Sequence, residues 1–141
     1  MIRVTVWNEF IQDGAWQQKD VIRHYPQGIH KYLESVLNDE FDVKTVTQFD
    51  KDGNLIENAG ITKELLDDTD VMIWWAHCKH SEVPDSATKM VADAVRSGMG
   101  IIFLHSAHLA KPFQALMGTS CTLHWREDGD YERVWNIAPS H

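Results

Sequence analysis

Several histidines lie in two short segments, each of which directly follows an apolar run of the sequence. His77-Cys78-Lys79-His80 follows one run, and His105-Ser106-Ala107-His108 follows another. Imidazole and thiolate groups both bind zinc, so the first segment could supply metal ligands. The second could supply ligands, or a general acid and base such as His105 and His108 beside a hydroxyl. The ordinary role of a single histidine is to cap a helix or bond to backbone, and for the group of His30, His77 and His105 both interpretations stay open.

Ser106 and Cys78 are the two candidates for a nucleophile. Ser106 lies between an apolar run and a helical pattern, where a nucleophile elbow places its residue, but its neighbours are not the glycines of G-x-S-x-G. Cys78 stands between histidines, although adjacent positions in a chain often point apart. A nucleophile is therefore the minority interpretation at both positions.

Acidic and aromatic side chains could complete a sugar site around the histidines. Glu9 could act as a general base or orient a ligating histidine, and a solvated carboxylate is the ordinary alternative. Trp125-Arg126-Glu127 offers an aromatic face for a sugar ring and a guanidinium for its hydroxyls, although an edge-strand tryptophan beside an exposed ion pair is more common. Of Trp74 and Trp75, one should face the core and the other the site, because successive strand residues point to opposite faces.

Alternating strand and helix patterns would position these segments. The patterns predict strands at 2–7, 42–48, 71–76 and 101–104, helices at 29–37, 62–66, 85–98 and 109–117, and two further strands at 119–125 and 132–137. This alternation predicts an α/β fold, a doubly wound parallel sheet with helices on both faces. Ligands bind such sheets at the carboxyl ends of the strands, where Glu9, His77 and His105 would meet.

Length and composition restrict the class of protein. The 141 residues are 43% hydrophobic and 24% charged, which suits one globular domain with a real core. A formal net charge of -8 argues against nucleic acid or an anionic membrane as partner. The sequence shows no signal-peptide pattern, no run long enough to span a bilayer and only two cysteines, so we expect a cytoplasmic protein. No glycine-rich phosphate loop follows the first strand, so no nucleotide cofactor is expected.

The order and spacing of the motifs resemble the trehalose-utilisation (ThuA-like) family over essentially the whole chain. The resemblance is carried by Val6-Trp7-Asn8-Glu9-Phe10, Tyr25-Pro26-x-Gly28-x-His30, Ile73-Trp74-Trp75-x-His77-x-x-His80, Leu104-His105-Ser106-x-His108, Leu116-Met117-Gly118-Thr119 and Trp125-Arg126-Glu127. It implies a three-layer, flavodoxin-like fold of the class I glutamine amidotransferase-like superfamily, in which His105-Ser106 stands near the nucleophilic cysteine of the amidotransferases. It also implies breakdown of trehalose and related disaccharides, beside oxidoreductases that make keto-sugars, and a metal ion at the histidines.

The chain departs from the family pattern in two ways. Members of the family continue for roughly another half-length, at the scale of a larger single domain, so residues 1–141 are expected to be one domain without its C-terminal part. Ala76 and Cys78 also stand where the family would have a glycine and a small or aliphatic residue.

These observations predict an enzyme that acts on a disaccharide or keto-sugar derivative, as a metal-assisted hydrolase, lyase or isomerase. The alternative is a non-catalytic sugar-binding or regulatory module; a glutamine amidotransferase is disfavoured, since no G-x-C-x-G elbow is present. The expected roles are catalysis by Glu9, His105, Ser106 and His108, substrate binding by Asn8, Trp75, Trp125 and Arg126, and binding of zinc or manganese by His30, His77 and His105. An exposed sheet edge would favour a homodimer.

Overall fold

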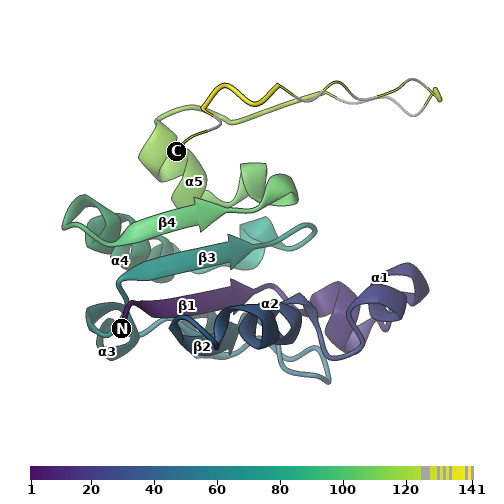
Figure 1. Cartoon of the computed structure of the whole chain (residues 1–141), viewed down its shortest axis with the longest axis horizontal. Coiled ribbons are helices and arrows are strands. Elements are labelled where there is room, and N and C mark those ends of the chain that lie inside the picture. The colour runs from purple at the N-terminus through teal and green to yellow at the C-terminus, as the bar shows by residue number, and fades with distance from the viewer. Residues whose placement is uncertain (125–127, 130, 132, 134, 139, 141) are drawn as a thin grey trace.

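The computed structural model describes residues 1–124, 128, 129, 131, 133, 135–138 and 140. Its centre is a four-stranded parallel sheet with the strand order β2-β1-β3-β4. The strands are β1 (Arg3–Asn8), β2 (Asp42–Thr47), β3 (Val71–Trp75) and β4 (Gly100–Phe103). This order is the flavodoxin-like one, and the expected α/β fold is confirmed. The arrows of β1, β3 and β4 point the same way in Figure 1, so their carboxyl ends share one edge of the sheet.

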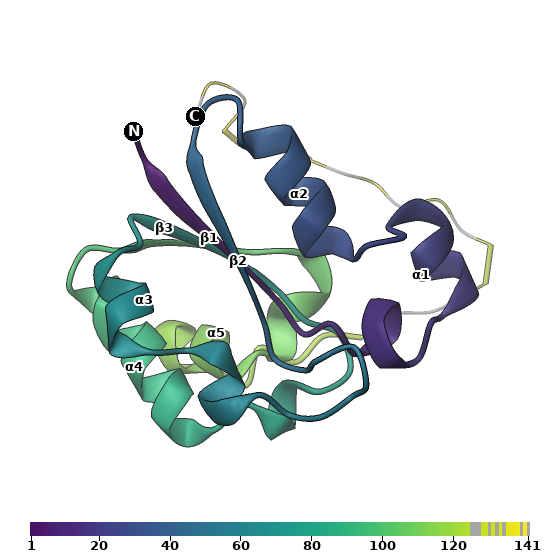
Figure 2. The ribbon, with the colours of Figure 1, turned by 90° about the horizontal axis from the view of Figure 1, so that it is seen from below.

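Helices cover both faces of the sheet and make three layers. α2 (Ile29–Leu37) packs on β1 and β2 from one side, whereas α3 (Lys63–Asp67), α4 (Asp85–Arg96) and α5 (Lys111–Met117) lie on the other side (Figure 2). A π-helical turn, η1 (Ile11–Ala15), and α1 (Lys19–His24) follow β1. Three short 3-10 helices complete the chain: η2 (Glu57–Gly60), η3 (His80–Glu82) and η4 (His105–Leu109). Of these, η3 and η4 lie directly beyond β3 and β4.

A stacked pair of tryptophans forms the centre of the core. Trp7 of β1 and Trp74 of β3 are both fully buried, and their ring centroids are 3.6 Å apart at an interplanar angle of 15°. The indole Nε1–H of Trp7 donates to the carbonyl of Ala59 at 2.8 Å, which fixes η2 against the sheet. The two residues are register partners on neighbouring strands, so the stack aligns the carboxyl ends of β1 and β3.

The sequence patterns located the four paired strands and most of the helices. The helix predicted at 62–66 is capped by Thr62, whose hydroxyl accepts from the backbone N–H of Leu65 at 3.1 Å. The helix predicted at 85–98 begins at Asp85, with Pro84 in the N-cap position, and ends at Arg96. The segment between β1 and α2, for which the sequence predicts no strand or helix, contains η1 and α1.

The strand predicted at 119–125 is wrong for residues 119–124, which form no strand. Their polar groups bond locally: the N–H of Cys121 donates to Thr119 Oγ1 at 3.1 Å, and such local bonds compete with strand pairing. In the predicted strand 132–137 the described residues are also irregular, whereas residues 125, 132 and 134 lie outside the described part of the chain.

None of the helices in the described part of the chain combines the length and the apolar character needed to cross a bilayer.

Candidate functional site

Glu9, directly after β1, ties the end of β1 to the loop that follows β3. The residue is fully buried, and its carboxylate accepts hydrogen bonds from three backbone amides: His77 at 3.1 Å, Cys78 at 3.0 and 3.1 Å, and Lys79 at 2.7 Å. Consecutive amides that converge in this way form a nest for an anion, and Glu9 supplies the anion from within the chain. Glu9 thus orients backbone rather than a histidine ring, and a role as general base would require the loop to release it.

A second buried side chain holds the same loop from β2. Gln48, which follows β2 and is fully buried, donates from Nε2 to the carbonyl of Lys79 at 3.3 Å. The loop is therefore fixed from both neighbouring strand ends. As a result His77 and Cys78 are exposed, while His80 is turned inward and buried.

The thiol of Cys78 is poorly suited to act as a nucleophile. Although Cys78 is exposed as a residue, partial desolvation of its thiol raises the pKa, and the negative charge of Glu9 raises it further, with a smaller opposing effect from Lys79. A thiol with a raised pKa carries little of the reactive thiolate at neutral pH. This agrees with the low rank that the sequence gives to Cys78.

Asn8 and His30 belong to a buried network on the α2 side. The side-chain Oδ1 of Asn8 accepts from the N–H of Phe10 at 2.8 Å, so its Nδ2 faces Asp13 Oδ2 at 3.0 Å and His30 Nδ1 at 2.8 Å. His30 Nδ1 is therefore an acceptor, which places the proton of the neutral ring on Nε2. Burial lowers the pKa of His30, partly opposed by Asp13, and keeps the ring neutral.

This network bears on two of the expected roles. A metal ligand must offer a free lone pair, but in His30 one nitrogen is engaged by Asn8 and the other carries the proton. Asn8, expected to bind substrate, is fully buried, and both ends of its amide are occupied by protein groups.

The segment after β4 turns sharply at His105. This residue has φ +21°, a conformation that residues other than glycine rarely adopt, and its side chain is exposed. Ser106 donates its hydroxyl to the carbonyl of Ala76 at 3.0 Å, which ties η4 to the end of β3. The ring of His108 lies 6.5 Å from that of His80, measured between centroids. The two histidine segments predicted from the sequence therefore do meet at the carboxyl edge.

A surface cavity opens beside this meeting point, and we call it the rim cavity. It has a volume of about 370 Å³. The loop after β3 and the stretch from η4 to α5 line it with Cys78, His80, Ser81, Leu109, Lys111 and Gln114. Its volume falls within the range of small-molecule sites, and its position matches the carboxyl-edge rule for open α/β sheets.

A comparison with known families decides which family this sequence belongs to. The family model described as trehalose utilisation, ThuA, matches residues 3–141. The chain belongs to the ThuA family. A search of curated proteins found no match. ThuA membership connects the chain with trehalose utilisation.

The three histidines expected to bind a metal in this ThuA-family chain do not form a ligand set. Within the residues that the structure describes, no three His, Cys, Asp or Glu side chains come close enough together to hold an ion. His30, His77 and His105 therefore do not converge on one position in the described part of the chain. Binding of zinc or manganese stays a prediction.

The remaining expected contacts have mixed outcomes. Trp74 is in the core, as one of the tryptophan pair should be, and Trp75 is half-buried on the opposite face. Trp125 and Arg126 lie outside the described residues. The sequence predicts no role for His80, although this residue belongs to one of the two histidine segments. No sequence pattern distinguishes His80 from His77, because which of the two is buried depends on the path of the loop.

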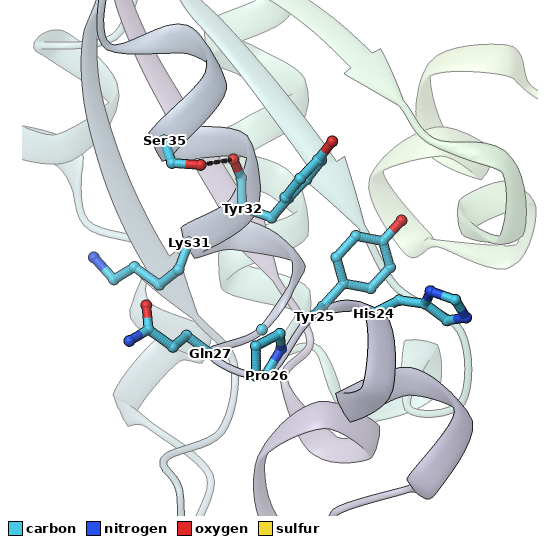
Figure 3. A pocket seen from close by; sticks show the side chains of 8 residues that line it. His24, Tyr25, Pro26, Gln27, Lys31, Tyr32 and Ser35 are labelled. Atoms are coloured by element: carbon cyan, nitrogen blue, oxygen red, sulfur yellow. Dashed lines mark hydrogen bonds between the residues drawn. The ribbon is translucent and has the colours of Figure 1, made fainter.

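A second, smaller cavity lies between α1 and α2 (Figure 3). It has a volume of about 180 Å³, and the rings of Tyr25 and Tyr32 meet there edge to face with centroids 5.3 Å apart. Lys31 and Gln27 extend away from these rings in Figure 3. None of its lining residues comes from the histidine segments after β3 and β4.

Proposed function

We propose that this ThuA-family protein binds a disaccharide of the trehalose type, or its keto derivative, in the rim cavity and acts on it there. The observation that carries the proposal is the cavity itself, at the edge of the sheet where ligands of open α/β folds bind. Membership of a family described as trehalose utilisation supports the choice of this class of ligand.

The lining of the rim cavity suits a ligand rich in hydroxyl groups. Lys111 donates from Nζ to the carbonyl of Val83 at 2.7 Å and pairs with Asp85 at 2.8 Å, which leaves one of its three donors. Gln114 donates its amide to the carbonyl of Ser120 at 3.1 Å, so its own side-chain oxygen can accept. Donors and acceptors set in a partly apolar wall are the usual means of orienting a small ligand.

Two versions of this function differ in whether the bound sugar is converted. His77 and His105 do not line the rim cavity, but both are exposed, and His77 directly precedes the lining residue Cys78. A histidine at the edge of the cavity that serves as acid or base would favour an enzyme, whether hydrolase, lyase or isomerase. The engaged groups favour a sugar-binding module, because the Glu9 carboxylate and the Ser106 hydroxyl already bond to the backbone. Product formation from trehalose and from its keto derivative separates the two: turnover supports the enzyme, and tight binding without turnover supports the module.

Filling the rim cavity tests the binding site directly. We expect Leu109→Trp to weaken binding of trehalose or its keto derivative by about tenfold or more, measured by titration calorimetry, because the larger ring occupies the cavity. Leu55→Trp is the matched control: Leu109 is 39% exposed and Leu55 48%, and Leu55 does not line the cavity. Equal weakening by both changes, or a wild-type protein that binds neither sugar, would refute the proposal.

A further inference from the structure

We propose that this protein forms a two-fold dimer through the α2 side of its sheet, where β3 and β4 carry no helix and a second copy of the chain covers them. The proposal goes beyond the proposed function and does not depend on it. The rim cavity borders α5, which lies on the opposite side of the sheet, so the two can be tested separately.

The two faces of the sheet are covered to different extents. α3, α4 and α5 lie on one face, whereas α2 packs on β1 and β2 from the other. In Figure 1, α2 crosses in front of β1 and β2, and no labelled helix lies in front of β3 and β4. Parallel sheets occur almost only with both faces covered, because their strands carry apolar side chains on both faces. The half formed by β3 and β4 on the α2 side therefore lacks a cover from the described chain.

The floor of this bare half is apolar. Asn8, whose side chain bonds to His30 of α2, is the register partner of Trp75. Trp75 and Ile73 therefore face the α2 side, because side chains two residues apart share a face, and Ile102 does so as the register partner of Ile73. Trp75 and Ile73 are half-buried, and Ile102 is 50% exposed. These side chains lie where a covering element would bury them.

α2 forms an apolar wall beside this floor. Tyr32 and Val36 are one turn apart on α2, and they are 52% and 57% exposed. Figure 3 shows the rings of Tyr25 and Tyr32 on one side of α2 and Lys31 on the other. We call the floor and the wall together the open shelf: Ile73, Trp75, Ile102, Tyr32 and Val36. Since aromatic and large aliphatic side chains bury roughly 150 to 250 Å² each, the open shelf presents several hundred Å² of apolar surface, a size that marks an interaction site.

The dimensions of the bare half suit one helix. Two neighbouring strands span about 10 Å, and a helix with its side chains is about 10 Å across. A two-fold axis parallel to the strands, between α2 and its copy, turns the second sheet to face the first and lays each α2 over the bare half of the other copy. Tyr32 then lies toward the partner's Ile102, and the symmetry forms this contact twice.

Charge and area favour a second copy as the occupant. The chain has a formal net charge of -8, so two copies repel each other over most of their surfaces. The side chains of the open shelf are all uncharged, and the nearest ion pair on α2 joins Lys31 to Glu34 at 2.8 Å. A standard interface buries about 800 Å² on each partner with a core rich in aromatic residues and poor in charge, and the open shelf supplies such a core.

The test measures mass by sedimentation equilibrium. We expect the wild type at micromolar concentration to have twice the 16.2 kDa of the chain. Tyr32→Glu and Ile102→Lys should each raise the dissociation constant of the dimer about a hundredfold or more, because each change buries two unpaired charges per dimer. Met117→Glu is the matched control: Met117 is 58% exposed on α5, across the sheet, and its variant should dimerise as the wild type does. All three side chains are at least half exposed in the single chain, so circular dichroism should show intact folds.

Mixing the two charged variants tests the contact itself. In a mixed dimer the carboxylate at position 32 of one chain faces the ammonium at position 102 of the other, while the second contact keeps its wild-type side chains. We expect Tyr32→Glu and Ile102→Lys, each monomeric alone, to associate when mixed in equal amounts. A mixture that stays monomeric would overturn the two-fold arrangement.

Two other results would overturn the proposal and identify a different arrangement. A dimer that Ile102→Lys separates but Tyr32→Glu leaves intact would show that the β4 edges pair with each other. A wild type that stays monomeric would leave the open shelf without a second copy. Methyl NOEs between Ile102 and Ile137 in such a monomer would assign the cover to the C-terminal segment of the same chain, where Ile137 is 95% exposed.

Discussion

The carboxylate of Glu9 bonds to three successive backbone amides and to no side chain of the histidine segments. Charge-assisted hydrogen bonds of this kind are stronger than neutral ones, and their acceptor is fully buried here. Glu9 is therefore a positioning residue for His77, Cys78 and His80. Its contribution should appear in the stability of the loop as well as in that of the whole fold.

We expect Glu9→Gln to lower the free energy of unfolding by about 2 to 4 kcal/mol, because a neutral amide replaces the charged acceptor and turns an NH₂ group toward backbone donors. Urea denaturation measures this change, and hydrogen exchange should quicken at the amides of residues 77–79. Glu40→Gln, at an exposed glutamate, is the control. A variant as stable as the wild type, with equally protected amides, would show that the nest does not depend on charge.

The sequence located the edge of the site but not the roles of its residues. The apolar runs before His77 and His105 showed that both segments follow parallel strands, so their meeting could be predicted. The sequence could not predict that Glu9 binds backbone amides or that Asn8 bonds to the ring of His30. Those partners depend on loop geometry rather than on residue type. His80 could have been favoured over His77 only by knowing which way the loop turns.

The stack of Trp7 on Trp74 gives the elements of the sheet their common alignment. Only one of the two indoles has a hydrogen bond: Trp7 Nε1 reaches the carbonyl of Ala59, whereas Trp74 Nε1 is buried without a partner in the described residues. The pair therefore permits the packing and the hydrogen bond to be measured separately.

We expect Trp7→Phe to destabilise the protein by about 1 to 3 kcal/mol more than Trp74→Phe does. Both changes remove similar ring volume, but only the first leaves the buried Ala59 carbonyl without its donor. Urea titrations of the two variants give the difference. If Trp74→Phe lowers the free energy of unfolding by as much as Trp7→Phe does, then the hydrogen bond from Trp7 to η2 contributes nothing to stability beyond packing.

The predictions of strands were correct where the strand is a buried apolar run, and wrong where residues form hydrogen bonds with their near neighbours in the chain. β3 and β4 are short apolar runs with neighbours on the sheet, and they form as predicted. Residues 119–124 are mostly polar, and within the described chain they have no strand beside them and bond to one another. The turn η1 begins after Phe10, which has a positive φ of 58°. No pattern in the sequence predicts this backbone conformation.

At the scale of the whole molecule, the titration of buried histidines should set the response of stability to pH. The pKa values of His30 and His80 are both lowered from 6.5, chiefly by burial. The unfolded chain then binds more protons than the folded one between the lowered values and 6.5. Stability is thus complete above that pH and is lost as the pH falls through it, by about 1.4 kcal/mol for each unit of lowering.

We expect Tm to fall between about pH 7.5 and about pH 5, and His80→Leu to reduce the fall. Carboxylates such as Asp70, whose hydrogen bonds from Arg3 lower its pKa to about 2, remain ionised over this interval and do not contribute. Thermal melts at a series of pH values measure the profile. A wild-type Tm that is flat over the interval would contradict the assignment of neutral, buried rings.

Two expectations at this scale, a cytoplasmic location and a homodimer, stay predictions. Within the described residues β4 pairs with β3 alone and carries the half-exposed Ile102, which is the kind of edge that could pair with a second copy.

The hydrogen bonds of Glu9 join parts of the chain that are 68 to 70 residues apart. Closing so long a segment costs entropy before any bond forms, and the pairing of β1 with β3 must provide that closure first. A chain folded only as far as β2 has no nest, no fixed His80 and no rim cavity. Capacity to bind the ligand should therefore arise late in folding, so that the appearance of binding during refolding marks completion of the central sheet rather than collapse of the chain.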